Sequence, residues 1–169
     1  GALRQEIIFA RRQKEIGRPP RWLSVPLIAT SHTWENAKNE QSHQDPTLPE
    51  ALLGEMADTA RVLFPIDANS AAASLRSVYA SHGQIACLVT PKRAVARLLS
   101  GARAQQAVAD GAAILLGDPR EADIQFVAIG AYQTAEALRA RERLMARGRS
   151  ACVTALFDPG RFRAGRDEI

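Results

Sequence analysis

Residues 84–90 read QIACLVT, and five consecutive apolar side chains, Ile85 to Val89, stand between Gly83 and Pro91. An almost continuous apolar run of this kind is typical of a β-strand that is buried on both faces. Such strands belong to parallel sheets that carry helices on either side. The stretch therefore predicts an α/β fold with a parallel sheet.

Working outward from this strand, apolar runs alternate with segments of helical spacing, which predicts strand–helix–strand units with parallel crossovers. Residues 100–120 contain four Gly or Pro residues and little regular period. We therefore expect a linker at 100–120, between a first part at 1–99 and a second part at 121–169. The further strands are expected at 22–28, 61–66, 124–129 and 150–157, and the helices at 3–16, 50–58, 70–79 and 133–147, with a turn or helix at 91–99.

The composition indicates a globular chain, since 46% of its 169 residues are hydrophobic and 24% are charged. Its formal net charge of +4 comes mainly from arginines on what reads as a solvated helix face. Aromatic residues do not alternate with these arginines, so we do not expect nucleic-acid binding. We expect no membrane segment either, because no apolar run approaches the roughly 20 residues of a span. Cys87 and Cys152 lie in apolar runs and predict buried free thiols in a reducing cytoplasm.

A polar stretch, residues 30–46 with the sequence TSHTWENAKNEQSHQDP, follows the first expected strand. Asp67 follows the second strand and Lys92 the third. Ligand crevices in open parallel sheets lie at the carboxyl ends of the strands. If the three strands are parallel neighbours, these groups share one rim.

Several kinds of chemistry are conceivable for this rim. A metal site of His32, His43 and Asp45 matches no standard ligand spacing. A catalytic triad of Ser42, His43 and Asp45 is disfavoured because neighbouring loop residues rarely reach relay geometry. His43 suits proton transfer, although spacing alone favours a histidine that hydrogen-bonds the backbone. Lys92 suits a phosphate ligand, although by itself it reads as a solvated lysine.

Four motifs, in the same order along the chain, are similar to those of the phosphoketolase family. The family has a stretch of the form HNGFSHQDPG, then PPDAN, then a lysine at the end of the following strand, and then a GDxPTxE turn. The corresponding segments here are Lys38–Pro46 (KNEQSHQDP), Pro65–Asn69 (PIDAN), Thr90–Lys92 (TPK) and Ile129–Glu136 (IGAYQTAE).

The resemblance implies a fold and an activity. Residues 1–99 would form part of a transketolase-like pyrimidine-binding domain, and residues 121–169 would begin a transketolase-like C-terminal domain. The family uses thiamine diphosphate and a divalent metal to cleave a ketose phosphate. With inorganic phosphate, the reaction gives acetyl phosphate and an aldose phosphate, and the substrates are xylulose 5-phosphate and often fructose 6-phosphate.

The same resemblance implies roles for individual residues. His43 would contact the substrate hydroxyls and assist proton transfer, and Asn39 would hydrogen-bond the sugar. Lys92 would face the substrate phosphate. Lys38 stands where the family has a histidine and offers a positive charge in its place. Glu40 and Gln41 replace the Gly and Phe of the family pattern.

Phosphoketolases are several times longer than 169 residues, so the chain is interpreted as a fragment. We expect no cofactor to be bound by this chain alone, and no turnover. A homodimer is expected, because the family builds its active sites between subunits and because apolar faces should remain uncovered. The alternative is a non-catalytic α/β module that kept the fold for binding or assembly.

Overall fold

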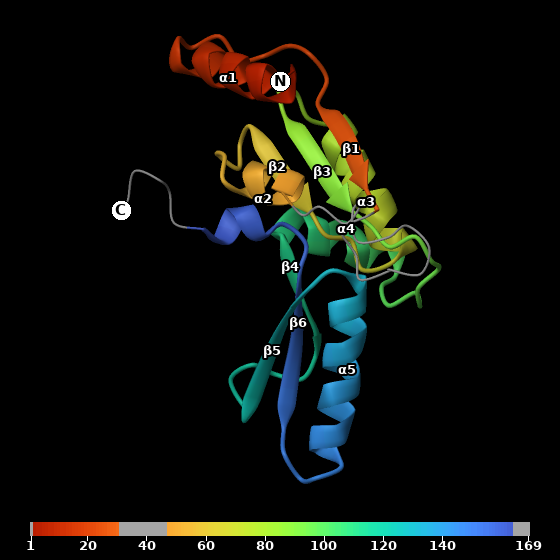
Figure 1. The fold of residues 1–169 in the computed structure, drawn as a ribbon. Helices are drawn as coiled ribbons and strands as arrows, with labels where there is room; N and C mark the ends of the chain where they lie inside the picture. The colour runs from red at the N-terminus through yellow and green to blue at the C-terminus, as the bar shows by residue number, and fades with distance from the viewer. Residues whose placement is uncertain (1, 31–46, 164–169) are drawn as a thin grey trace.

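A computed structural model of the chain describes residues 2–30 and 47–163. It contains two three-stranded sheets, one above the other in Figure 1. The first sheet has the order β1-β3-β2, and all of its strands are parallel. The strands are β1 (Val25–Ala29), β2 (Ala60–Leu63) and β3 (Ile85–Val89).

The central strand β3 is buried at all five positions, which confirms the prediction from its apolar run. Alternate side chains point to opposite faces. Ile85, Cys87 and Val89 pack with residues of α1 (Ala2–Glu15) and α2 (Thr47–Leu53). Ala86 and Leu88 pack with Val78 of α3 (Ala68–Tyr79). Helices thus cover both faces, as an α/β fold requires.

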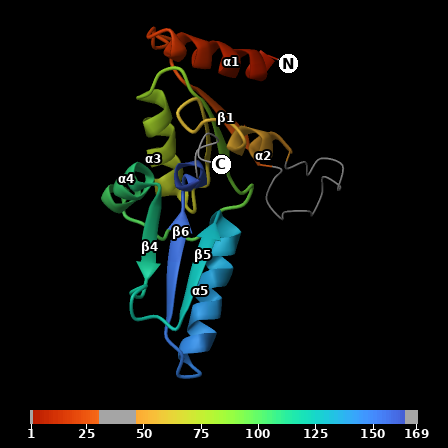
Figure 2. The same cartoon turned by 90° about the vertical axis from the view of Figure 1, so that its left-hand side faces the viewer.

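The second sheet has the order β4-β6-β5. Its strands are β4 (Ala112–Leu116), β5 (Ile124–Ile129) and β6 (Ala151–Leu156), and α5 (Ala131–Met145) connects β5 to β6. β5 and β6 are parallel, whereas β4 runs antiparallel to β6. β4 lies in the segment expected to be a linker, so neither this strand nor its antiparallel pairing was predicted. Figure 2 shows β5 and β6 in front of α5, with no helix of the described residues on the near face of this sheet.

The segment expected to be a linker, 100–120, is largely regular structure. It holds α4 (Gly101–Asp110) and then β4. Ser100 caps α4 by accepting a hydrogen bond from the backbone N–H of Arg103. The buried side of α4 is made of Ala104, Ala107 and Val108. Residues 91–99 form no helix. The division into parts at 1–99 and 121–169 stays a prediction.

The two sheets are joined by contacts at the end of β6. The backbone N–H of Phe64, just after β2, donates to the carbonyl of Phe157 at 2.9 Å. A cluster of buried apolar residues connects α3 and α4 with the end of β6. Arg61 of β2 forms a buried ion pair with Asp158, with 3.0 Å between Nε and Oδ2. A 3-10 helix, Pro159–Phe162, lies close to the end of the described residues.

Candidate functional site

The carboxyl ends of β1, β2 and β3 lie at one edge of the first sheet, because these strands are parallel neighbours. The polar stretch leaves this edge after β1, Asp67 follows β2, and Lys92 follows β3. The strand order needed for a shared rim is therefore present. Lys92 is exposed at this edge. Lys38, Asn39 and His43 lie outside the described residues, as do His32, Ser42 and Asp45.

A pocket of about 240 Å³ lies between the ends of β2 and β3. Lys92 is not among the residues that line it, but its neighbour Arg93 is. Sequence reasoning passed over Arg93, although a second basic residue next to Lys92 was a visible signal. The polar residues that line the pocket are Asp67, Thr90 and Arg93. Its apolar lining includes Pro65, Ala71 and Val95.

Asp67 begins α3 and is only 4% exposed. One carboxylate oxygen accepts hydrogen bonds from the backbone N–H and the hydroxyl of Ser70, at 2.8 and 2.7 Å. The other accepts from the backbone N–H groups of Leu98 and Leu99, both at 2.8 Å. The first pair makes Asp67 the N-cap of α3. The second pair ties the β3–α4 connection to the start of α3.

These hydrogen bonds determine the charge state of Asp67. Burial alone would raise the pKa of the carboxyl group, since it penalises the charged form. The hydrogen bonds from Ser70, Leu99 and Leu98 outweigh burial and hold the pKa below its ordinary value. Asp67 is therefore an anion at neutral pH, and its contacts make it a structural clamp.

Asn69 strengthens the same connection. Its side-chain amide donates to the carbonyl of Leu99 at 2.6 Å. The Asp67-Ala68-Asn69 element thus holds both polar groups of the Leu99 backbone. The loop that carries Thr90, Lys92 and Arg93 is fixed at its far end by these contacts. We conclude that this motif shapes the rim.

A larger cavity of about 1030 Å³ adjoins the same edge of the first sheet. It is lined by Phe64 and Val89 at the strand ends, by Glu50 and Leu53 of α2, and by β5 and the first turns of α5. The motif at 129–136 therefore lies against the carboxyl edge of the first sheet. Gly130 has a φ of 89°, which favours glycine at this strand-to-helix turn.

Within the described residues, no group of three or more His, Cys, Asp or Glu side chains could hold a metal ion. Cys87 and Cys152 are buried free thiols, as predicted. Burial raises the pKa of Cys87 to about 11, which makes its thiol unreactive at neutral pH.

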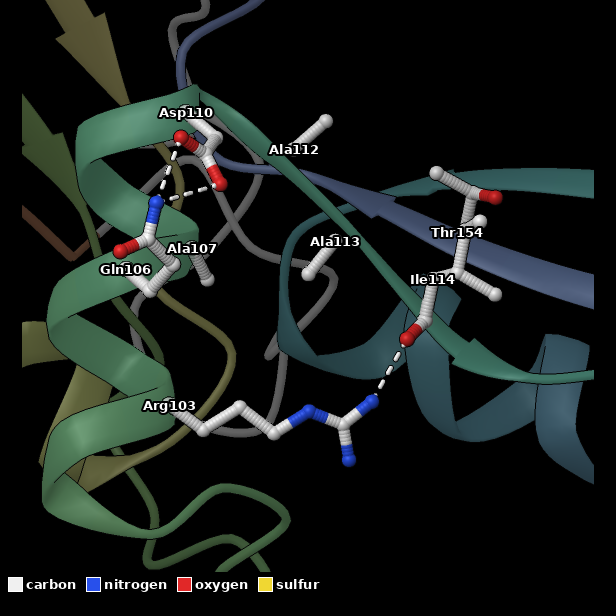
Figure 3. A pocket seen from close by; sticks show the side chains of 8 residues that line it. All are labelled: Arg103, Gln106, Ala107, Asp110, Ala112, Ala113, Ile114 and Thr154. Atoms are coloured by element: carbon white, nitrogen blue, oxygen red, sulfur yellow. Dashed lines mark hydrogen bonds between the residues drawn. The ribbon is translucent and has the colours of Figure 1, made fainter.

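A third pocket, about 340 Å³, lies between α4 and the edge strand β4 (Figure 3). Its polar groups bind one another. Arg103 donates to the carbonyl of Ile114 at 2.6 Å, and the Gln106 amide donates to both carboxylate oxygens of Asp110. Charged side chains that cover an edge strand protect it from pairing with other chains. This arrangement protects β4 and offers few groups to a ligand.

None of the helices in the described residues is long and apolar enough to cross a membrane.

Comparisons with known proteins agree with the resemblance seen in the sequence. Residues 1–81 match the family model for D-xylulose 5-phosphate/D-fructose 6-phosphate phosphoketolase. The chain is 30% identical over 146 residues to a xylulose-5-phosphate phosphoketolase of Lactiplantibacillus pentosus. That match covers 84% of this chain and 18% of the relative. The likeness to phosphoketolases is thereby confirmed, and the chain spans about a fifth of such a relative's length.

Solved transketolase structures have a fold similar to that of this chain. A transketolase variant from Pichia stipitis matches with a TM-score of 0.59 and 24% identity, over 75% of this chain and 18% of that one. A split-gene transketolase matches with a TM-score of 0.53 and 22% identity. It is described as an inactive tetramer of beta subunits. It covers 89% of this chain and 46% of that chain. The transketolase-like α/β fold expected from the sequence is confirmed.

Proposed function

We propose that this chain is part of a thiamine-diphosphate-dependent phosphoketolase. The enzyme would cleave a ketose phosphate with inorganic phosphate and give acetyl phosphate and an aldose phosphate, which is carbon–carbon lyase chemistry. The observation that carries the proposal is the match of residues 1–81 to the family model. The common carboxyl edge of the first sheet supports it, because the motif-bearing connections leave the sheet there.

The proposed roles follow the motifs. Lys92 and Lys38 bind the substrate phosphate by charge-assisted hydrogen bonds. His43 moves a proton at the substrate hydroxyls, and Asn39 hydrogen-bonds the sugar. Lys92 follows the fully buried strand β3 by three positions, which supports a role at the carboxyl edge of the sheet.

Thiamine diphosphate and its divalent metal supply the carbon–carbon cleavage chemistry in this proposal. The described residues do not fit the metal, because no cluster of acidic, histidine or cysteine ligands occurs among them. We therefore assign no step to the cofactor in this chain, and we propose that the chain alone holds none and is inactive. The split-gene transketolase supports this view as a neighbour in fold whose β tetramer is described as inactive.

The experiment measures acetyl phosphate released from xylulose 5-phosphate and inorganic phosphate by the intact protein that contains this chain. Lys92→Ala should raise KM for the sugar phosphate about tenfold or more, because a charge-assisted contact contributes roughly 1.5–3 kcal/mol. His43→Ala should lower kcat about a hundredfold or more. Arg97→Ala, an exposed arginine of the same loop that does not line the pocket, is the control. An intact protein that releases no acetyl phosphate would overturn the proposal.

A second candidate is a non-catalytic α/β module that kept the fold for binding or assembly. It is favoured by the departures from the family pattern at Lys38, Glu40 and Gln41. If the chain is such a module, its binding or assembly should be unchanged by Lys92→Ala and His43→Ala. A chain that binds or assembles in this way without any cofactor-binding partner would support the module.

We also propose that the chain associates with itself as a homodimer and has no nucleic-acid or membrane partner. The proposed location is the cytoplasm, where sugar phosphates occur. Large apolar side chains on the second sheet support a self-contact, since Val127 is 61% exposed and Ile114 is 45% exposed. These two residues flank Thr154 of β6 in register. Sedimentation of the chain and of Val127→Lys tests this, and a monomer at all concentrations would contradict it.

A further inference from the structure

A cavity of about 920 Å³ lies at the opposite, amino-terminal edge of the first sheet. Trp22, three residues before β1, and His82, three residues before β3, are both in its wall. Gln13, near the end of α1, and the segment 17–21 complete it. None of these residues belongs to the carboxyl edge, where the proposed catalytic groups are expected.

The charge of this cavity is one-sided. Two guanidinium groups, from Arg18 and Arg21, and the imidazole of His82 line it. Among the described residues that line it, none carries a carboxylate. Arginine side chains without a counter-charge attract anions, and arginine suits phosphate because of its forked set of donors.

Two neutral polar atoms in the wall lack partners. The indole nitrogen of Trp22 and the amide oxygen of Gln13 are buried, and neither forms a hydrogen bond within the described structure. A buried polar atom without a partner is costly, on the order of 1–3 kcal/mol. Neither atom is open to the cavity, so both remain inside its wall, and the polar side chains left for a ligand are those of Arg18, Arg21 and His82.

The walls are held in place before any ligand arrives. The backbone N–H of Gly83 donates to the carbonyl of Trp22 at 3.0 Å, and that of Arg18 donates to Gln13 at 2.8 Å. Leu23 and His82 form a β-bridge. Gly83 has a φ of 73°, and a Cβ there would lie 2.1 Å from Pro20 Cγ, so these two segments are in close contact. A rigid site loses less entropy on binding.

We infer that this cavity is a binding site for a small phosphate ester. Arg18 and Arg21 bind the phosphate, and His82 adds a ring donor. The volume lies within the range of small-molecule sites, about 300–1,000 Å³. The inference does not depend on the proposed phosphoketolase activity.

Glycerol 3-phosphate is the probe, titrated into the ¹⁵N-labelled chain while the indole N–H signal of Trp22 is followed. The chain has two tryptophans, and Trp34→Phe assigns the signal. We expect a saturable shift in the unmodified chain and in Lys92→Ala. The double variant Arg18→Gln/Arg21→Gln should bind about tenfold or more weakly, since it loses two charge-assisted contacts.

Arg143→Gln/Arg147→Gln is the matched control, because it removes the same charge from exposed positions on and just after α5. It should bind like the unmodified chain. An unmoved Trp22 signal, or equal weakening in both double variants, would overturn the inference. Glycerol and a short DNA duplex separate the possible sources of the effect. A shift with glycerol, or with the duplex but not with glycerol 3-phosphate, would also contradict a small phosphate ester.

Discussion

At the scale of single residues, Asp67 connects the start of α3 to Leu98 and Leu99, which lie 31 and 32 positions later in the chain. Each of its carboxylate oxygens accepts two hydrogen bonds. Only an acceptor-only side chain satisfies all four donors. The sequence alone indicates the N-cap, because capping is local. The bonds to Leu98 and Leu99 could not be foreseen, since nothing in the spacing places that loop above α3.

Asp67→Asn should lower the free energy of unfolding by about 1–3 kcal/mol at pH 7. An asparagine can still cap α3, but its NH₂ group then faces the N–H groups of Leu98 and Leu99 and leaves these donors unpaired. Urea unfolding measures the difference. Asp110→Asn is the control, because Asp110 is exposed and its recorded side-chain partner is Gln106, and it should change stability by less than about 0.5 kcal/mol. Equal losses in both variants would contradict the clamp.

The difference in the free energy of unfolding between the unmodified chain and Asp67→Asn should also depend on pH. The pKa of Asp67 is lowered in the folded state, so the unfolded state takes up the proton first. The stabilisation is complete above the ordinary carboxyl pKa of about 3.9 and is lost as the pH falls below it. Asp58, Asp118 and Asp123, whose pKa values are lowered too, are present in both proteins and cancel. Urea unfolding at about pH 7, 5 and 3 should show that this difference in the free energy of unfolding becomes smaller only at the lowest pH. A difference that stays constant would contradict the lowered pKa of Asp67.

At the scale of elements, two strands agree with the sequence prediction, whereas α4 and β4 were not predicted. The expected strand at 124–129 coincides with β5, and the run at 84–90 contains β3. The helix α4 buries Ala104, Ala107 and Val108 at helical spacing, but the glycines at 101, 111 and 117 favour a loop in the sequence. β4 pairs with β6, about 40 residues later, and a register irregularity between Ile114 and Leu116 disturbs the pairing. Local sequence does not report such distant pairing.

If α4 is a folded helix and not part of a linker, its N-cap should matter. Ser100→Ala should lower the free energy of unfolding by about 0.5–2 kcal/mol, because the N–H of Arg103 loses its acceptor. Ser100→Asp keeps an acceptor and should be neutral or slightly stabilising. Hydrogen exchange of the α4 amides locates the effect. Unprotected amides across Gly101–Asp110 in the unmodified chain would restore the linker interpretation.

At the scale of the whole molecule, a buried polar cluster around Asp158 joins the two sheets, beside the apolar cluster and the Phe64–Phe157 backbone hydrogen bond. Asp158 is 1% exposed and accepts hydrogen bonds from Arg61 at 3.0 Å and Arg161 at 3.1 Å. Arg61 also donates to Ser77 of α3. Because Arg61 lies in β2 and Asp158 follows β6, this cluster fixes the second sheet against the first. The position of α5 beside the carboxyl edge therefore depends on it.

Removing one partner of the Arg61–Asp158 pair should therefore destabilise the junction more than removing both. Asp158→Ala leaves the Arg61 guanidinium buried without its counter-charge and should cost about 3–5 kcal/mol. The double variant Arg61→Met/Asp158→Leu replaces the pair by apolar side chains and should recover most of that loss. Urea unfolding of Arg61→Met, Asp158→Leu and the double variant provides a double-mutant cycle. If the two single effects simply add, the sheets are held by the apolar cluster and the Phe64–Phe157 backbone contact, and the ion pair contributes nothing specific to their arrangement.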